Sequence, residues 1–119
     1  WKHGKTEVSM FWEDAELDLD CKARMDWFDA NSMKIVDLKF TNKIDKFSNQ
    51  KLMENYLSVQ AAWYSRGVYE LTGSKCEFSF ILVEKYSPHM ISVIKASEEI
   101  IFHGEQTILK MIKRFSKKT

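Results

Sequence analysis

The chain has 119 residues, of which 45% are hydrophobic and 13% aromatic, enough for one folded domain with a hydrophobic core. Its 18 Lys and Arg against 17 Asp and Glu give a formal net charge of +1, which excludes recognition of nucleic acid by overall charge and leaves local patches. No apolar run approaches the roughly 20 residues of a membrane-spanning helix, and no signal peptide is visible. We therefore expect a cytoplasmic protein without a membrane partner, with Cys21 and Cys76 as reduced thiols rather than a disulfide.

The first third of the chain predicts three strands. Residues 6–12 alternate polar and apolar side chains, residues 20–28 follow an acidic turn, and residues 32–40 follow the turn sequence DANS. The core face of the first strand consists of Val8, Met10 and Trp12. On the second strand, alternation places Lys22, Arg24 and Asp26 on one face and Cys21, Ala23 and Met25 on the other. On the third strand, Asp37 and Lys39 project together, away from Val36, Leu38 and Phe40.

The remaining chain predicts a long helix, two strands and a final helix. The helical segment covers residues 47–73 as one long helix or two joined helices, with Ser48 as N-cap and Gly73 as its stop. Its expected buried stripe is Leu57, Ala61, Tyr64, Val68 and Leu71. Residues 76–85 form an apolar strand that we expect to be covered on both faces, and residues 90–96 form a strand after the turn YSPH. The last helix begins near Ser97, with Ile101, Ile108, Ile112 and Phe115 on one side and a solvated, lysine-rich end.

This order, β-β-β-α-β-β-α, is typical of an α/β or α+β sandwich, in which helices flank a central mixed sheet. The helix between the third and fourth strands allows those two strands to be parallel.

Three charged residues interrupt this otherwise apolar sheet. Folding the second strand back along the third brings Asp26 close to Asp37, beside Lys39. Two neighbouring carboxylates repel each other unless a proton or cation lies between them, and hard oxygen ligands suit Mg²⁺ or Mn²⁺. With a lysine to orient water or steady phosphate charge, this set is suited to metal-assisted phosphodiester hydrolysis. The alternative is an Asp–Lys ion pair at a sheet edge, with Asp26 in a turn.

Other side chains have more open interpretations. Gln60 and Tyr64 share a helical face, either to support the charged site or as ordinary core residues. Trp27 is a candidate for stacking on a DNA base, and Lys22 and Arg24 are candidates for contacting phosphates or for balancing the charge of Asp26. His89 is interpreted as a turn residue and His103 as a helix-surface residue.

The pattern of Asp26, the run Asp37-Leu38-Lys39 and a helix carrying Gln60-Ala-Ala-Trp-Tyr64 resembles the PD-(D/E)XK nuclease superfamily, in its RecB-like branch. The segment SMFWEDAELDLDCKARMDW narrows the resemblance to RecE-type exonucleases (the phage-type exodeoxyribonuclease VIII). The resemblance covers residues 7–64. It implies a restriction-endonuclease-like core.

For site residues, the resemblance implies that Asp26, Asp37 and the Leu38 backbone carbonyl bind Mg²⁺ or Mn²⁺. It further implies that Lys39 places or activates the attacking water, and that Gln60 and Tyr64 support the site and nearby DNA. Enzymes of this type digest linear double-stranded DNA in recombination and repair, act with a single-strand annealing protein, and often assemble as rings. The alternatives are a restriction-like endonuclease and a non-catalytic DNA-binding or assembly module.

The sequence departs from the family pattern in two ways. Met25 stands where the family has proline before the first aspartate, and no residue matches the His or Glu ligand that the branch supplies from an upstream helix. Neither His3 nor Glu7 fits that role. We therefore expect residues 1–119 to form a single nuclease core that lacks this N-terminal helix and has weakened or no activity.

Overall fold

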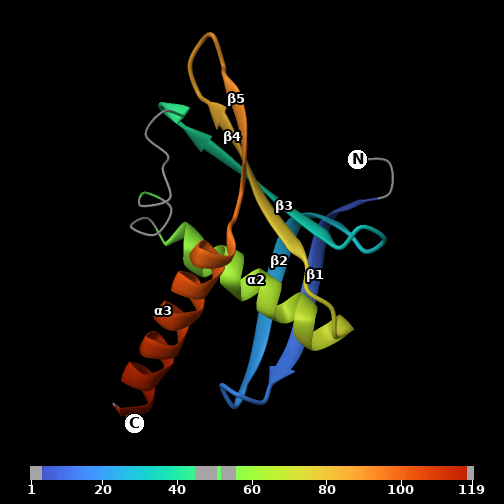
Figure 1. The fold of residues 1–119 in the computed structure, drawn as a ribbon, viewed down its shortest axis with the longest axis vertical. Coiled ribbons are helices and arrows are strands. Elements are labelled where there is room, and N and C mark those ends of the chain that lie inside the picture. The colour runs from blue at the N-terminus through green and yellow to red at the C-terminus, as the bar shows by residue number, and fades with distance from the viewer. Residues whose placement is uncertain (1–3, 45–50, 52–55, 118–119) are drawn as a thin grey trace.

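The computed structural model describes residues 4–44, 51 and 56–117, which form a five-stranded sheet with two helices (Figure 1). In chain order the elements are β1 (Lys5–Asp14), β2 (Leu19–Asp29), β3 (Lys34–Thr41), α2 (Leu57–Thr72), β4 (Glu77–Glu84), β5 (Ile91–Lys95) and α3 (Glu98–Lys117). This confirms the predicted order and the α+β class. Ser48, the expected N-cap, and His3 lie outside the described residues.

The sheet has the order β1-β2-β3-β4-β5, and β3 and β4 are parallel while the other neighbours are antiparallel. The helix α2 makes the crossover from β3 to β4, as predicted, because a tight turn cannot join parallel strands. The turn between β2 and β3 is held by Asp29, whose carboxylate accepts the Asn31 backbone N–H at 2.9 Å and the Ser32 hydroxyl at 2.8 Å.

The strands β2 and β3 pair over a short distance and then separate. Their paired residues run from Asp29↔Lys34 to Trp27↔Val36, and Asp26 is the first residue beyond them. Further along β2, the Trp63 indole of α2 donates a hydrogen bond of 3.0 Å to the Lys22 carbonyl, in place of a strand partner. The separation of β2 from β3 therefore leaves a gap that begins at Asp26.

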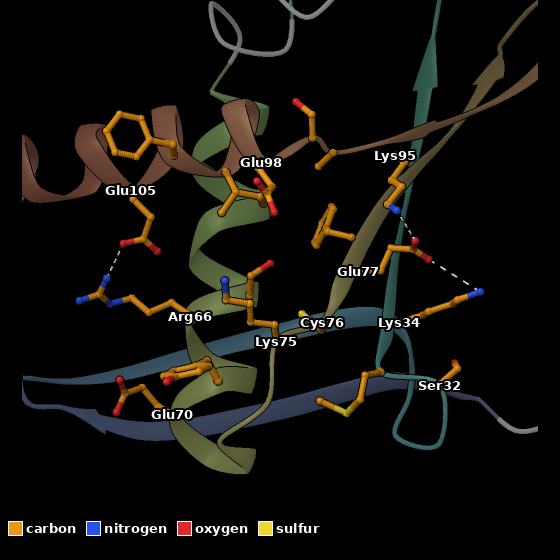
Figure 2. A pocket seen from close by; sticks show the side chains of 18 of the residues that line it. Ser32, Lys34, Arg66, Glu70, Lys75, Cys76, Glu77, Lys95, Glu98 and Glu105 are labelled. Atoms are coloured by element: carbon orange, nitrogen blue, oxygen red, sulfur yellow. Dashed lines mark hydrogen bonds and ion pairs between the residues drawn. The ribbon is translucent and has the colours of Figure 1, made fainter.

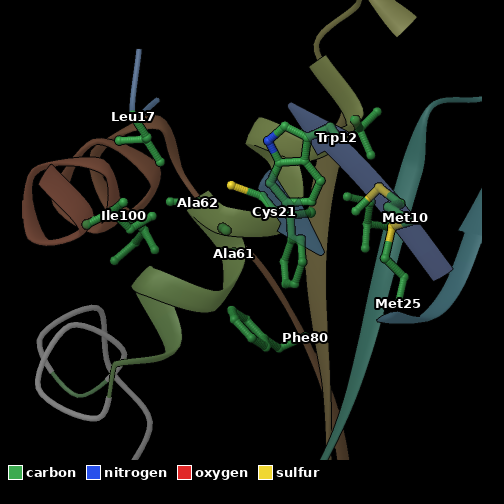
Figure 3. Close-up of a cluster of buried hydrophobic side chains, with 14 of the residues drawn as sticks. Met10, Trp12, Leu17, Cys21, Met25, Ala61, Ala62, Phe80 and Ile100 are labelled. Carbon is green, nitrogen blue, oxygen red and sulfur yellow. The ribbon is translucent and has the colours of Figure 1, made fainter. Parts of the chain in front are cut away.

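The core lies between the sheet and α2 (Figure 3). It includes Met10, Trp12, Cys21, Met25, Ala61, Ala62 and Phe80. The rings of Trp12 and Trp63 lie 5.2 Å apart, and a Cβ atom at Gly67 would lie 2.8 Å from the Trp12 ring. The missing side chain at Gly67 thus lets α2 approach β1 closely enough to fix the helix over the sheet.

The two helices pack directly against each other. A Cβ atom at Gly104 of α3 would lie 2.0 Å from the Ser58 carbonyl oxygen of α2, so only glycine fits this crossing. Next to it, the Ser58 hydroxyl lies 2.9 Å from His103 Nδ1. His103 is therefore part of the helix interface and not a surface residue, which corrects the sequence interpretation. His89 lies in the exposed β4–β5 turn, as predicted.

The predicted buried stripes hold near the helix crossing and fail toward the helix ends. Ala61 and Val68 of α2 and Ile108 of α3 are buried as expected, but Leu71 is 53% exposed and Phe115 is 73% exposed. The reason is that α2 and α3 cross each other, so the distal turns of both helices extend beyond their common contact (Figure 1). Gly73 ends α2 as predicted, with a left-handed φ of 75°.

Among the described residues, helices cover one face of β3, β4 and β5. Phe78, Phe80 and Leu82 of β4 are buried on that face, whereas Ile81 and Val83 on the other face are only half-buried. Neighbouring side chains on the other face are exposed, namely Leu38, Phe40, Ile91 and Val93. The expectation that β4 is covered on both faces is therefore not met in the described part of the chain. No helix there is long and apolar enough to cross a membrane.

Candidate active site at the separation of β2 and β3

Asp37 is a buried carboxylate in the middle of the sheet, with a residue exposure of 3%. Its Oδ1 accepts a hydrogen bond of 3.2 Å from Gln60 Nε2. Its Oδ2 is 3.2 Å from the Lys39 ammonium, but this ion pair lacks hydrogen-bond geometry, and Oδ2 is left buried without a hydrogen-bond partner. A buried polar atom without a hydrogen bond costs about 1–3 kcal/mol, so Oδ2 is a position that a bound cation would satisfy.

The environment raises the pKa of Asp37 from 3.8 to about 6. The main cause is burial, which penalises the charged carboxylate, and the nearby Asp26 carboxyl adds to it. The Lys39 ammonium lowers the pKa but only partly offsets burial. A divalent cation would reverse this balance, because it favours the ionised form of both carboxylates.

Asp26 lies across the gap from Asp37. Its Oδ2 accepts the Leu38 backbone N–H at 2.8 Å, so a side chain occupies the place where the β2–β3 ladder would otherwise continue. Because the N–H and C=O of one residue project to the same side of a strand, the Leu38 carbonyl also points to this side. Asp26 itself is solvent-exposed, which leaves the site open on the side of β2.

The helix α2 supplies the remaining polar groups. Gln60 donates to Asp37 and also lies 3.4 Å from the Tyr64 hydroxyl, which is one helical turn further along. Tyr64 in turn packs on Phe78, with ring centroids 6.0 Å apart. The pair thus connects the buried carboxylate to the core.

The structure brings together the five residues that the sequence proposed for catalysis, Asp26, Asp37, Lys39, Gln60 and Tyr64. Asp37 and Lys39 do form the ion pair of the alternative interpretation. Asp26, however, belongs to strand β2 and not to a turn. The ion pair itself lies where β3 still pairs with β4 but no longer with β2, at the edge of the gap.

The proposed DNA-contacting residues separate into two groups. Lys22 and Arg24 are exposed on the face of β2 that carries Asp26. Trp27 is 8% exposed and lies against Gly4, so its ring has little surface for a DNA base, which contradicts its assignment as a DNA contact. Phe11, which the sequence patterns did not single out, is 70% exposed and lies opposite Lys22 in the β1–β2 pair. The sequence feature that could have identified Phe11 is its position, because it is an apolar residue where the alternation of the first strand expects a polar one.

The two carboxylates fit a hard divalent cation such as Mg²⁺. Mg²⁺ is bound through one or two carboxylates and keeps several waters. The buried Asp37 Oδ2, without a hydrogen-bond partner, and the Leu38 carbonyl supply further oxygen donors beside Asp26. Among the described residues, no group of three or more His, Cys, Asp and Glu side chains forms a metal cluster, so water and backbone would complete the coordination.

A cavity of about 1380 Å³ in the described part of the chain lies elsewhere, between α2, α3 and the start of β4 (Figure 2). Several of its charged side chains pair with one another. Glu77 bridges Lys34 and Lys95, and Arg66 Nη1 contacts Glu105 at 2.5 Å. Neither Asp26, Asp37 nor Lys39 lines it. Size alone therefore does not locate the chemistry in this molecule.

Comparisons with known proteins agree with the fold. A family described as "PDDEXK-like domain of unknown function (DUF3799)" matches residues 1–118. The crystal structure of a candidate exonuclease from Eubacterium rectale matches with a TM-score of 0.81 and 22% identity, over 95% of this chain and 46% of that chain. The structure of SSO0001 matches with a TM-score of 0.52 and 15% identity, over 89% of this chain and 50% of that chain.

No curated protein matches the chain. The chain spans about half the length of the two solved structures, with 46% and 50% of them covered. At these identities the structural likeness shows the fold alone.

Proposed function

The chain belongs to the family of PDDEXK-like domains, and on that premise we propose that it is the core of a divalent-metal-dependent exodeoxyribonuclease acting on linear double-stranded DNA. Within the PD-(D/E)XK fold, the finer resemblance to RecE-type enzymes supports the exonuclease over an endonuclease. The single observation that carries the proposal is the buried Asp37 carboxylate, adjoined by Asp26 and Lys39. Burying a carboxylate beside another is costly for folding and useful for holding a cation.

Each side chain has a role that follows from its position. Asp26, Asp37 and the Leu38 carbonyl would hold Mg²⁺ or Mn²⁺, which when bound polarises the phosphodiester and lowers the pKa of water. The Lys39 ammonium, which lies 3.2 Å from Asp37, would orient the attacking water or neutralise charge developing on the phosphate. Gln60 fixes the Asp37 carboxylate through its hydrogen bond to Oδ1.

The test is cleavage of linear and closed-circular duplex DNA with Mg²⁺, Mn²⁺ or EDTA. We expect metal-dependent loss of linear DNA only, abolished in Asp37→Ala and in Lys39→Ala. The matched controls are Asp18→Asn and Lys85→Ala, which change exposed residues outside the site and should cleave as the unchanged chain does.

Cleavage of closed-circular DNA would show that the activity is that of an endonuclease and not an exonuclease. DNA binding without cleavage would support a non-catalytic module, a reading favoured by the small number of acidic ligands among the described residues. The expected single-strand annealing partner, ring assembly and role in recombination remain predictions that follow from the same resemblance, and the cytoplasmic location remains a prediction from the sequence.

A further inference from the structure

The outer face of the β1–β2 hairpin carries an exposed aromatic ring next to two exposed cations. The register pairs Phe11 with Lys22 and Ser9 with Arg24, so these four side chains form two neighbouring rows on one face. Residues on the opposite face, such as Met10 and Trp12, are buried. The exposure of Phe11, at 70%, is therefore a property of a well-fixed strand and not of a loose end.

These rows lead directly to the proposed active site. Along β2, Lys22, Arg24 and Asp26 project from the same face at intervals of about 7 Å, since a strand rises ~3.4 Å per residue. Beyond Lys22 the next row is acidic, Glu13 opposite Asp20. The basic stretch is therefore bounded by acids at both ends and offers two positions for phosphate groups.

We propose that this face, made of Phe11, Lys22 and Arg24, holds an unpaired DNA strand whose end enters the site at Asp26. The proposal rests on the function proposed above. A flat strand surface presents the Phe11 ring to solvent, and an aromatic ring can stack only on a base that is outside a duplex stack. Lys22 and Arg24 contact the phosphates on either side of that base.

The contact that Arg24 already makes does not prevent this role. Its guanidinium lies 3.0 Å from Glu7, but both side chains are largely exposed, at 65% and 72%. Such an exposed ion pair contributes little to stability, so Arg24 can exchange Glu7 for a phosphate. Glu7 thus competes with the strand, and removing its charge should strengthen binding.

The experiment measures the affinity of the chain for a fluorescent single-stranded oligonucleotide and for a blunt duplex, by anisotropy in EDTA so that no metal-dependent cleavage occurs. Stacking contributes about 1–3 kcal/mol per base, so Phe11→Ala should weaken single-strand binding by about 5- to 150-fold and leave duplex binding unchanged. Phe11→Trp keeps an aromatic ring at this position and should bind single strands as the unchanged chain does. The matched control is Phe102→Ala, which removes a ring that is 65% exposed on α3.

The contribution of Lys22 and Arg24 is measured separately, through the salt dependence of single-strand binding. Lys22→Gln and Arg24→Gln should each reduce the slope of log affinity against log salt concentration by about 0.7, and Glu7→Gln should tighten binding. The proposal is overturned if the unchanged chain does not bind single strands, or if Phe11→Ala behaves as Phe102→Ala does.

The two proposals fail in different assays. Metal-dependent cleavage that is insensitive to Phe11 and Lys22 would overturn the strand-binding face and leave the nuclease standing. Single-strand binding that depends on Phe11, without any cleavage, would support the strand-binding face and overturn the nuclease.

Discussion

At the scale of a single residue, Asp37 is unusual because burying its ionised carboxylate costs folding free energy. Its pKa in the folded chain, about 6, is above the value of 3.8 for an unperturbed aspartate. The folded state therefore binds the proton more tightly than the unfolded state does. It follows that this group favours folding most below about pH 4, and that this contribution is lost as the pH rises through about 6.

We predict that the metal-free chain loses about 2 kcal/mol of stability from this group between pH 4 and pH 7, since each pKa unit corresponds to ~1.4 kcal/mol and the unfolded aspartate is already partly ionised at pH 4. The measurement is urea unfolding in EDTA at both pH values, for the unchanged chain and for Asp37→Asn. The variant cannot titrate at this position, so the difference between the two proteins isolates Asp37 from all other groups. Equal pH dependence of both proteins would contradict the assignment.

Gln60 acts on the site through Asp37 and not on the substrate. Its amide donates to Asp37 Oδ1, so Gln60→Ala leaves both oxygens of that carboxylate without a hydrogen bond. Groups that orient a metal ligand typically change metal affinity by 10- to 100-fold, and we expect a loss of this size. Titration with Mn²⁺ checks it, with Gln106→Ala on the exposed face of α3 as the control. Unchanged affinity would mean that Gln60 is only a core residue.

At the scale of elements, the crossing of α2 and α3 depends on Gly104. Alanine is the better helix former, so propensity alone predicts that Gly104→Ala stabilises the chain. Its Cβ, however, would lie 2.0 Å from the Ser58 carbonyl oxygen, and backbone on both sides limits relaxation. We therefore predict destabilisation by about 1–3 kcal/mol in thermal or urea unfolding.

The control for this prediction is Gly73→Ala, at the end of α2. There a Cβ meets no atom within 4 Å, and only the positive φ of 75° opposes the change. A loss of about 1 kcal/mol is expected at this position. If Gly104→Ala proves as mild as, or milder than, this control, the helices do not cross as closely as described.

Arg66 joins three elements of the fold. Its guanidinium binds Asp14 at the end of β1, Glu16 in the following turn and Glu105 on α3. Burial alone would raise the pKa of Asp14, but its hydrogen bonds with Arg66 and Trp12 lower it overall. Without Arg66, the fully buried Asp14 side chain would carry an uncompensated charge.

We predict that Arg66→Met destabilises the chain by about 3–5 kcal/mol, the usual effect of removing one partner of a buried ion pair. Arg114→Met, which replaces an exposed arginine on α3, should have almost no effect. Chemical unfolding of both variants is the measurement. A double change of Arg66→Met with Asp14→Asn should recover much of the loss, and a failure to do so would locate the stabilisation elsewhere.

At the scale of the whole molecule, local sequence patterns sufficed to predict the order of strands and helices along the chain and the closeness of the two carboxylates. The positions of Asp26, Asp37 and Lys39 follow from a period of two residues and one turn, and both are local properties of the chain. Gln60 and Tyr64 were placed by helical spacing in the same way. The parallel arrangement of β3 and β4 followed from the length of the connection between them.

What the sequence did not reveal depends on how elements approach one another. Trp27 was proposed as a DNA contact although it continues the Met25 face of its strand, and its ring is buried with Gly4 close against it. Leu71 keeps the helical spacing of the core, yet the crossing of α2 and α3 leaves it exposed. The separation of β2 from β3 at Asp26 has no signature in composition, and it is this separation that opens the site.

The central claim is that Asp26 and Asp37 together hold a divalent cation. Its most direct test is Mn²⁺ binding measured by electron paramagnetic resonance at neutral pH, because bound Mn²⁺ loses the signal of the free ion. The account predicts one site, lost in Asp26→Asn and in Asp37→Asn and kept in Lys39→Ala, since the lysine is not a ligand. Mn²⁺ binding by Asp37→Asn that equals binding by the unchanged chain would contradict it.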